Sequence, residues 1–299
     1  MKYLQIFHDR VQILCLLISL HMFVFSCSRD KDPRTSVHPK TDEMVLTLFK
    51  GRSIPELIPP LTTTFGPISI EQAYLIQDQL AKKIATVRGS VKGYKIGFAS
   101  ESEQEKFAIS EPACGRLYRD QIMENGAILD VNEFFSFNIE AEIAFKVGRR
   151  IDKVIKDRND LKEYIQSVHA SFDLFNAWYD LTQGIQTAAD FIANSGGSHY
   201  FVLGSPVDPE KVDLDNQVLK LFHDGENIYE GHSTAVLGSP WNIMKWIANH
   251  ELNRGFPLQP GYVILTGKVA PAFKASGVKA KGTYVGDCGD LGKIKVILK

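Results

Sequence analysis

A strand is predicted over residues 137–145, which read Phe-Asn-Ile-Glu-Ala-Glu-Ile-Ala-Phe. Because successive side chains of a strand point to opposite faces, Glu140 and Glu142 share one face and the apolar side chains share the other. Two such charges about 4 Å apart repel by roughly 4 kcal/mol at an effective dielectric constant near 20. A hard cation with oxygen ligands, such as Mg²⁺, Mn²⁺ or Ca²⁺, would stabilise the pair. An ordinary half-exposed strand with a polar face shows the same pattern, and the pattern alone favours that plainer interpretation.

The first 27 residues are expected to be a lipoprotein signal peptide. A weakly basic start precedes an apolar stretch over residues 11–25, which is too short and too polar for a transmembrane helix. The stretch ends in Val-Phe-Ser-Cys at residues 24–27, which resembles a bacterial lipobox with Cys27 as the lipidated residue. An ordinary signal peptide cleaved nearby is the alternative. The chain is therefore expected to be exported and anchored by lipid to a membrane facing the periplasm or the cell exterior.

The remaining residues are expected to divide into a short tether and one large domain. Residues 28–43 are polar and contain two prolines, so they cannot bury enough apolar surface to fold. Residues 44–299 are long enough for a substantial core. The 34 lysines and arginines nearly balance the 35 aspartates and glutamates, which gives no electrostatic reason to expect a nucleic-acid partner.

Cysteine is sparse after the predicted leader, where only Cys114 and Cys288 occur. An exported protein could pair them in a disulfide, but nothing in their spacing requires it. We therefore expect two buried free thiols. The sequence has no Cys-x-x-Cys and no His-Glu-x-x-His motif, so it gives no support to a zinc site.

Hydrophobic periodicity predicts a helical N-terminal part followed by a β-rich body. The predicted helices span residues 70–87, 160–168 and 240–252. The predicted strands span residues 91–97, 137–147, 170–178, 261–267 and 293–299, and a hairpin joins 218–223 to 228–230 through an Asp-Gly turn. This order indicates an α+β fold with a mixed or antiparallel sheet. The strand at 170–178 is apolar except for Asp173, whose ionised carboxylate would be costly to bury without a partner.

Four segments stand in the order of one known family. They are Gly-Tyr-Lys-Ile-Gly at 93–97, Ile-Glu-Ala-Glu-Ile-Ala-Phe at 139–145, Leu-Gly-Ser-Pro-Trp-Asn-Ile-Met-Lys-Trp-Ile-Ala-Asn at 237–249 and Gly-Tyr-Val-Ile-Leu-Thr-Gly at 261–267. From about residue 45 to the C-terminus, the chain resembles the 2-keto-4-pentenoate hydratase and 2-oxo-3-hexenedioate decarboxylase family, within the fumarylacetoacetate hydrolase superfamily. The four segments together are specific for that superfamily, whereas any one alone would be weak.

The resemblance implies a site for one divalent cation, usually Mg²⁺ or Mn²⁺. The family's Glu-x-Glu pair falls on Glu140 and Glu142, and its third acidic ligand falls on Asp173. Three carboxylates without a nitrogen or sulfur ligand suit a hard metal with room for water and substrate. The resemblance also implies that this cation binds the carboxylate and the C2 oxygen of a 2-oxo acid and acts as a Lewis acid.

The resemblance also implies roles for residues on two other segments. Lys95 matches the family's active-site lysine, which donates or carries a proton; a surface lysine on a glycine-flanked strand is the plainer alternative. Thr266 and Gly267 match a segment that contacts the substrate carboxylate in relatives. The implied reaction is the hydration of a 2-hydroxy-2,4-dienoate, with decarboxylation of a 2-oxo acid as the alternative. Relatives are homo-oligomers, so a homo-oligomer is expected.

Several positions depart from the hydratase pattern. Ala113 stands where an acidic residue is common, Asn176 begins a segment that usually reads Asp-Ser-Arg, Asn194 replaces an aspartate, and Tyr262 replaces another aspartate. These changes leave open a third interpretation, a lipid-anchored and catalytically impaired binder of metal or small acids. The hydrolase branch uses a His-Glu pair on a lid, and the absence of any histidine between residues 38 and 169 argues against that activity.

Overall fold

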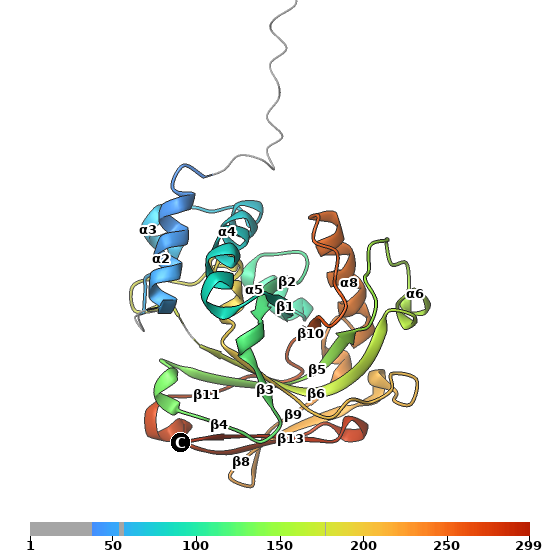
Figure 1. The fold of residues 1–299 in the computed structure, drawn as a ribbon. Coiled ribbons are helices and arrows are strands. Elements are labelled where there is room, and N and C mark those ends of the chain that lie inside the picture. The colour runs from blue at the N-terminus through green and yellow to red at the C-terminus, as the bar shows by residue number, and fades with distance from the viewer. Residues whose placement is uncertain (1–37, 54–56, 177) are drawn as a thin grey trace, which may run out of the picture. The chain divides into compact units, whose positions relative to one another are not determined.

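A computed structural model describes residues 38–53, 57–176 and 178–299. The predicted signal peptide, its lipidation site Cys27 and most of the predicted tether lie outside these residues. The structure has two sheets with helices on one side of them (Figure 1). Within the described part of the chain, no helix is both long enough and apolar enough to cross a membrane.

The larger sheet is mixed and has the strand order β2-β1-β10-β5-β6-β7-β3, with β11 pairing alongside β5. The β1–β10 and β3–β7 pairs are parallel, and the other pairs are antiparallel. Its strands are β1 (Val91–Gly97), β2 (Ala113–Tyr118), β3 (Ile122–Glu124), β5 (Phe137–Val147), β6 (Ile165–Asn176), β7 (Tyr200–Leu203), β10 (Val263–Leu265) and β11 (Phe273–Ala275).

The smaller sheet has the order β4-β13-β12-β8-β9 and packs on one face of the larger one. Its strands are β4 (Ala127–Leu129), β8 (Val218–His223), β9 (Glu226–His232), β12 (Gly282–Asp287) and β13 (Lys293–Leu298). Phe172 on β6 is fully buried, and its ring would lie only 3.0 Å from a Cβ atom placed on Gly286 of β12. A larger residue at position 286 would therefore force Phe172 or its neighbours to shift where the two sheets pack together. Since Phe172 points toward the smaller sheet, its neighbour Asp173 points to the other face.

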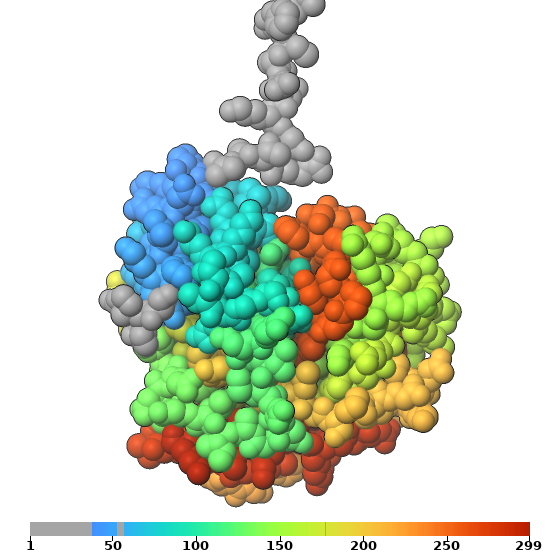
Figure 2. Space-filling model, in the orientation of Figure 1, coloured from blue at the N-terminus to red at the C-terminus, as the bar shows by residue number. Residues whose placement is uncertain are grey.

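Helices cover the face of the larger sheet on which Asp173 lies, and α2 and α4 form adjacent parts of the molecular surface (Figures 1 and 2). The helix α4 begins with a capping box between Ser69 and Gln72, an arrangement that pairs otherwise unbonded N–H groups. Its buried apolar side chains each contribute roughly 1.5–3 kcal/mol if fully removed from water. The helices are α2 (Thr41–Ser53), α3 (Leu61–Phe65), α4 (Ile70–Arg88), α5 (Glu101–Phe107), α6 (Arg158–Lys162), α7 (Ala188–Ala193) and α8 (Pro240–Asn253).

Most predicted elements are confirmed, and so is the α+β class. The predicted helix over residues 160–168 is wrong in its second half. The helix α6 ends at Lys162, and β6 begins at Ile165, where it pairs with the end of β5. Pairing along a long antiparallel partner decided the conformation of this stretch, against its local helical pattern. The helix α2 begins at Thr41, three residues before the expected start of the domain.

Candidate active site

The strand pair β5–β6 brings the three predicted carboxylates together. Glu140 lies directly opposite Asp173 in the register, and Glu142 lies two residues further along the same face of β5. One oxygen from each of the three residues lies within 4.8 Å of the others. Glu142 and Asp173 are buried, and the Glu140 side chain is only 10% exposed. The interpretation as an ordinary half-exposed polar strand is therefore wrong, because the pair faces the protein interior.

Burial governs the protonation of these carboxyl groups. It raises the pKa of Glu140 to about 7, with Lys268 as the main opposing charge. Burial, and then the charges of Asp173 and Glu140, hold the pKa of Glu142 well above its ordinary value. Burial also raises the pKa of Asp173, although Lys95 opposes it. Without a further cation, the group therefore holds protons that isolated carboxyl groups would release.

Two oxygens of the group are available to a ligand. Glu142 Oε2 accepts a hydrogen bond of 2.7 Å from the backbone N–H of Gly267. Glu142 Oε1 and Asp173 Oδ1 are buried and have no hydrogen-bond partner among residues 38–53, 57–176 and 178–299. A buried acceptor without a partner costs roughly 1–3 kcal/mol, and more when it is charged. Unsatisfied carboxylate oxygens that converge in this way fit a hard divalent cation.

Lys95 on β1 reaches the same group of carboxylates, although β10 separates β1 from β5 in the strand order. It is buried, forms an ion pair with Asp173 Oδ2, and places Nζ 4.4 Å from the centroid of the Phe175 ring. A Cβ atom on Gly97 would overlap the ring of Phe191, and one on Gly196 would lie 3.4 Å from Lys95 Cε. The absence of side chains at Gly97 and Gly196 therefore leaves room for the Phe191 ring and for the Lys95 side chain. The interpretation of Lys95 as a surface lysine is wrong.

Two charged residues of the site escaped the sequence analysis. Lys268 forms an ion pair with Glu103 at the start of α5, and its Nζ lies 3.8 Å from Glu140 Oε1. Its position directly after the Thr-Gly segment was a signal that could have identified it. The four carboxylates of the site face two ammonium groups, so full ionisation leaves an excess of two negative charges. One divalent cation would neutralise that excess.

Thr266 and Gly267 line the interior edge of the site. The Thr266 hydroxyl donates to the carbonyl of Ile143 at 3.0 Å, so it already has a partner. Gly267 has φ of +93°, and a Cβ atom there would lie 2.7 Å from that of Ala99. A side chain at this position would therefore strain the backbone that holds Glu142. Contact of either residue with a substrate carboxylate stays a prediction.

A cavity of about 280 Å³ is lined by residues of β5 and β6 that neighbour the carboxylates, although its described lining includes neither the three carboxylates nor Lys95. Asn138 shares the strand face of Glu140, and Lys274 on β11 lies opposite Asn138 in the register. Phe175 belongs both to this cavity and to the surroundings of Lys95. The cavity is lined by Ser136, Asn138, Phe175, Asn176, Trp178, Tyr179, Leu181, Gln186, Phe191, Asn194, Gly196, Gly197 and Lys274.

The departures from the hydratase pattern have structural partners here. Asn176 accepts hydrogen bonds from the backbone N–H groups of Phe135 and Ser136 at 3.0 and 3.2 Å. Asn194 accepts from Arg52 through its side-chain oxygen at 2.8 Å. Both asparagines also line the cavity. Their amides therefore support the wall of the site, while Ala113 is simply buried in β2.

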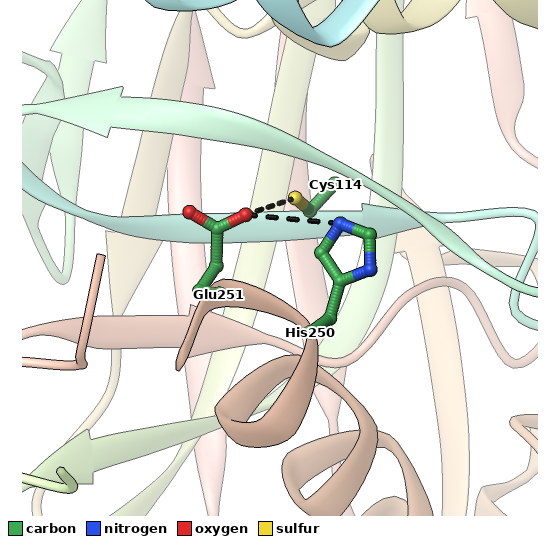
Figure 3. A group of neighbouring side chains, drawn as sticks. All are labelled: Cys114, His250 and Glu251. Carbon is green, nitrogen blue, oxygen red and sulfur yellow. Dashed lines mark hydrogen bonds and ion pairs between the residues drawn. The ribbon is translucent and has the colours of Figure 1, made fainter. Parts of the chain in front are cut away.

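A second cluster, on the β2–α8 side of the fold, contains Cys114, His250 and Glu251 (Figure 3). Glu251 Oε1 lies 3.6 Å from Cys114 Sγ and 3.8 Å from His250 Nε2. The same oxygen accepts a hydrogen bond of 2.6 Å from Arg254, whose guanidinium supplies the positive charge that a metal would bring. Burial raises the pKa of the Cys114 thiol well above its ordinary value, which disfavours the thiolate that zinc needs. Cys114 and Cys288 are both buried free thiols, as predicted.

Comparison with known proteins identifies the family. Residues 117–296 match the family model "Fumarylacetoacetate (FAA) hydrolase C-terminal". The chain belongs to this family. The matched segment includes the three carboxylates and the Thr-Gly segment but begins after Lys95.

Several curated relatives are named as hydratases. The 2-keto-4-pentenoate hydratase of Burkholderia vietnamiensis (strain G4 / LMG 22486) is 29% identical over 254 residues, which are 84% of this chain and 95% of that protein. The one of Paraburkholderia xenovorans (strain LB400) is 27% identical over 231 residues, 77% of this chain and 85% of the relative. A 2-oxo-hept-4-ene-1,7-dioate hydratase of Escherichia coli is 28% identical over 248 residues, which are 80% of this chain and 90% of that protein. The predicted resemblance to this group of enzymes is thus confirmed.

A solved structure supports the same fold. The 4-oxalocrotonate decarboxylase from Pseudomonas putida G7, complexed with magnesium and adipate, superposes with a TM-score of 0.80. Its sequence is 20% identical, and the match covers 87% of this chain and 97% of that one. At this identity the likeness confirms the architecture, while the roles of individual site residues stay predictions.

Proposed function

We propose that the chain is a divalent-cation-dependent carbon–oxygen lyase that hydrates a 2-hydroxy-2,4-dienoate or related unsaturated 2-oxo acid, such as 2-keto-4-pentenoate. The observation that carries this proposal is the convergence of Glu140, Glu142 and Asp173 with Lys95. The names of the curated relatives, which are hydratases of such acids, support it. The partner of the site is accordingly a small 2-oxo acid.

The cation is proposed to be Mg²⁺ or Mn²⁺, held by Glu140, Glu142 and Asp173. Their buried oxygens without partners fit it, and the donor set contains only oxygen. The similar decarboxylase structure contains magnesium. A divalent cation, when bound, supplies Lewis-acid polarisation of a carbonyl oxygen.

The chain's own residues provide proton transfer and enclosure. Hydration adds a hydroxyl group to one carbon of a double bond and a proton to another carbon of the conjugated system. Lys95 Nζ, buried beside the cavity, is placed to carry that proton, and Asp173 Oδ2 holds the ammonium in position. Phe175 covers this ammonium, and Phe191 packs against the nearby Gly97 and Gly196. Both rings limit the access of bulk water, which strengthens the electrostatic interactions inside the site.

The proposal is tested by turnover of 2-hydroxypenta-2,4-dienoate, followed through loss of the conjugated chromophore. Protein freed of metal by chelation should be inactive and should regain activity with Mg²⁺ or Mn²⁺. Glu142→Gln should lower turnover more than about 100-fold, since even substitutions outside the ligand shell of metal sites cost 10- to 100-fold. Glu163→Gln, on the exposed surface, is the matched control and should leave the rate unchanged. Full activity in chelator would contradict the proposal, and binding of the acid without turnover would instead favour the catalytically impaired binder.

Decarboxylation of a 2-oxo acid is the second candidate. Apart from the carboxylates already assigned to the cation or paired with Lys268, the described residues that line the neighbouring cavity include no acid and no histidine. Hydration needs a group that activates water, whereas loss of CO₂ needs only an acceptor for the electron pair and a proton donor such as Lys95. The release of CO₂ from 2-oxo-3-hexenedioate, without consumption of 2-hydroxypenta-2,4-dienoate, would select this candidate.

Export and lipidation at Cys27 are also proposed, on the strength of the lipobox-like segment at residues 24–27. Expression in a bacterium with labelled palmitate should give a labelled, membrane-associated protein. Cys27→Ser should abolish the label, and an unlabelled wild-type protein would refute lipidation. A homo-oligomer is proposed from the family resemblance, and light scattering during gel filtration measures it directly.

A further inference from the structure

The ammonium of Lys268 lies between two carboxylates that come from different parts of the fold. It forms an ion pair with Oε1 of Glu103, which belongs to the first turn of α5. On its other side, Nζ lies 3.8 Å from Oε1 of Glu140, one of the proposed cation ligands. That separation is longer than a hydrogen bond, so the ammonium is bonded to Glu103 and only attracted by Glu140. The proposed reaction gives no role to Glu103.

The backbone that carries Lys268 is tied to β5 by three hydrogen bonds. The N–H and the hydroxyl group of Thr266 both donate to the carbonyl of Ile143 at 3.0 Å. The Gly267 N–H donates to Glu142 Oε2 at 2.7 Å. Lys268 therefore starts from a fixed point beside the carboxylates. The place of its ammonium is decided by the flexible side chain and by the partners that hold it.

The helix that carries Glu103 is anchored as well. The hydroxyl of Ser100, its N-cap, accepts a hydrogen bond of 3.4 Å from the backbone N–H of Glu103. The buried side chain of Gln104 donates to the carbonyl of Phe98 at 2.9 Å, and the rings of Phe98 and Phe107 lie 4.6 Å apart between centroids. The helix α5 therefore presents the Glu103 carboxylate, which is 22% exposed, at a defined place next to Lys268.

Without this partner, the ammonium would compete with a cation for Glu140. The lysine stem is flexible, and a shift of about 1 Å would bring Nζ from 3.8 Å to the roughly 2.8 Å of a charge-assisted hydrogen bond with Glu140. At an effective dielectric constant near 20, this shift strengthens the attraction enough to change an equilibrium constant roughly tenfold. A carboxylate oxygen bonded to an ammonium has to release it before it can bind a metal.

We propose that Glu103 is a positioning residue of the cation site, which holds Lys268 away from Glu140 and so keeps that carboxylate available to the divalent cation. The inference rests on the proposed cation site formed by Glu140, Glu142 and Asp173. From 3.8 Å, the ammonium still offsets the negative charge of the cluster without occupying a ligand oxygen. Glu103 acts through Lys268, so its contribution to cation binding depends on that lysine.

The test is calorimetric titration of the full-length protein with Mg²⁺ at pH 8, after treatment with chelator and dialysis. Glu103→Gln should bind Mg²⁺ roughly tenfold more weakly than wild type. Glu105→Gln removes the same charge from an exposed position of the same helix and is the matched control, which should bind as wild type does. Thermal melting in chelator checks that each variant folds. Equal affinity of wild type and Glu103→Gln would overturn this inference alone, whereas a wild type that binds no Mg²⁺ would overturn the cation site as well.

A double-mutant cycle separates positioning from direct attraction of the cation by the Glu103 charge. In Lys268→Met the ammonium is absent, so adding Glu103→Gln to that variant should weaken Mg²⁺ binding by about threefold or less in 0.15 M salt, which screens partly exposed charges. The difference between the two backgrounds measures the contribution that passes through Lys268. A tenfold loss in both backgrounds would refute the proposal, because it would show that Glu103 acts on the cation without the lysine.

Discussion

The raised pKa of Glu140 makes the stability of the metal-free protein depend on pH in a predictable direction. In the folded chain the pKa is about 7, against an ordinary value of 4.5, so folding favours the protonated form. The stabilisation is fully present below pH 4.5 and is lost as the pH rises to about 7. A shift from 4.5 to about 7 corresponds to roughly 3 kcal/mol in total, at 1.36 kcal/mol for each pKa unit.

The assay is urea unfolding in chelator at several pH values between 4.5 and 8. The free energy of unfolding of wild type, relative to Glu140→Gln, should fall by roughly 1.4 kcal/mol for each pH unit in this window and level off above pH 7. Glu163→Gln should keep the wild-type slope, since the hydrogen bond with Lys153 lowers the pKa of Glu163 and places its titration below this window. Addition of Mg²⁺ above pH 7 should restore stability. Parallel pH profiles for wild type and Glu140→Gln would refute the reasoning that burial controls this carboxyl group.

Three further predictions concern other parts of the site and the core. Lys95→Met should lower turnover at least about 100-fold through loss of proton transfer, while calorimetry still detects Mg²⁺ binding; unchanged turnover would remove Lys95 from the mechanism. Gly97→Ala should lower the free energy of unfolding by about 1–3 kcal/mol, measured in urea, because its Cβ atom would overlap the Phe191 ring. Burial raises the pKa of both the Cys114 and Cys288 thiols, the latter to about 12, so an aromatic disulfide reagent should label neither until denaturant is added. Rapid labelling of the native protein would show that the thiols are accessible.

Local sequence patterns predicted the strands that carry the site residues better than they predicted the contacts around those residues. The alternation around Glu140 and Glu142 identified one strand face, and the apolar run around Asp173 identified a buried acid. The register that places Glu140 opposite Asp173 depends on how two strands pair, and no local pattern specifies that. The family resemblance alone indicated that Asp173 joins Glu140 and Glu142 at one site.

The remaining features come from contacts between distant segments. Glu103 and Lys268 are far apart in the chain and meet only because α5 and the segment after β10 fold against one another. The wrong assignment of a helix over residues 160–168 has a similar cause, because hydrogen bonds to β5 outweighed local preference there. Interactions across the sheet are the part of this structure that sequence reasoning without relatives could not supply.

Lys268 has a consequence for the order in which this protein matures. Its ammonium, together with that of Lys95, already gives the clustered acids two internal counter-ions. These two counter-ions would let the polypeptide fold before a metal binds, so that loading of the proposed site would be a separate, later event. If the proposed export takes place, this separation would let the compartment of destination, rather than the site of synthesis, determine which ion the protein acquires.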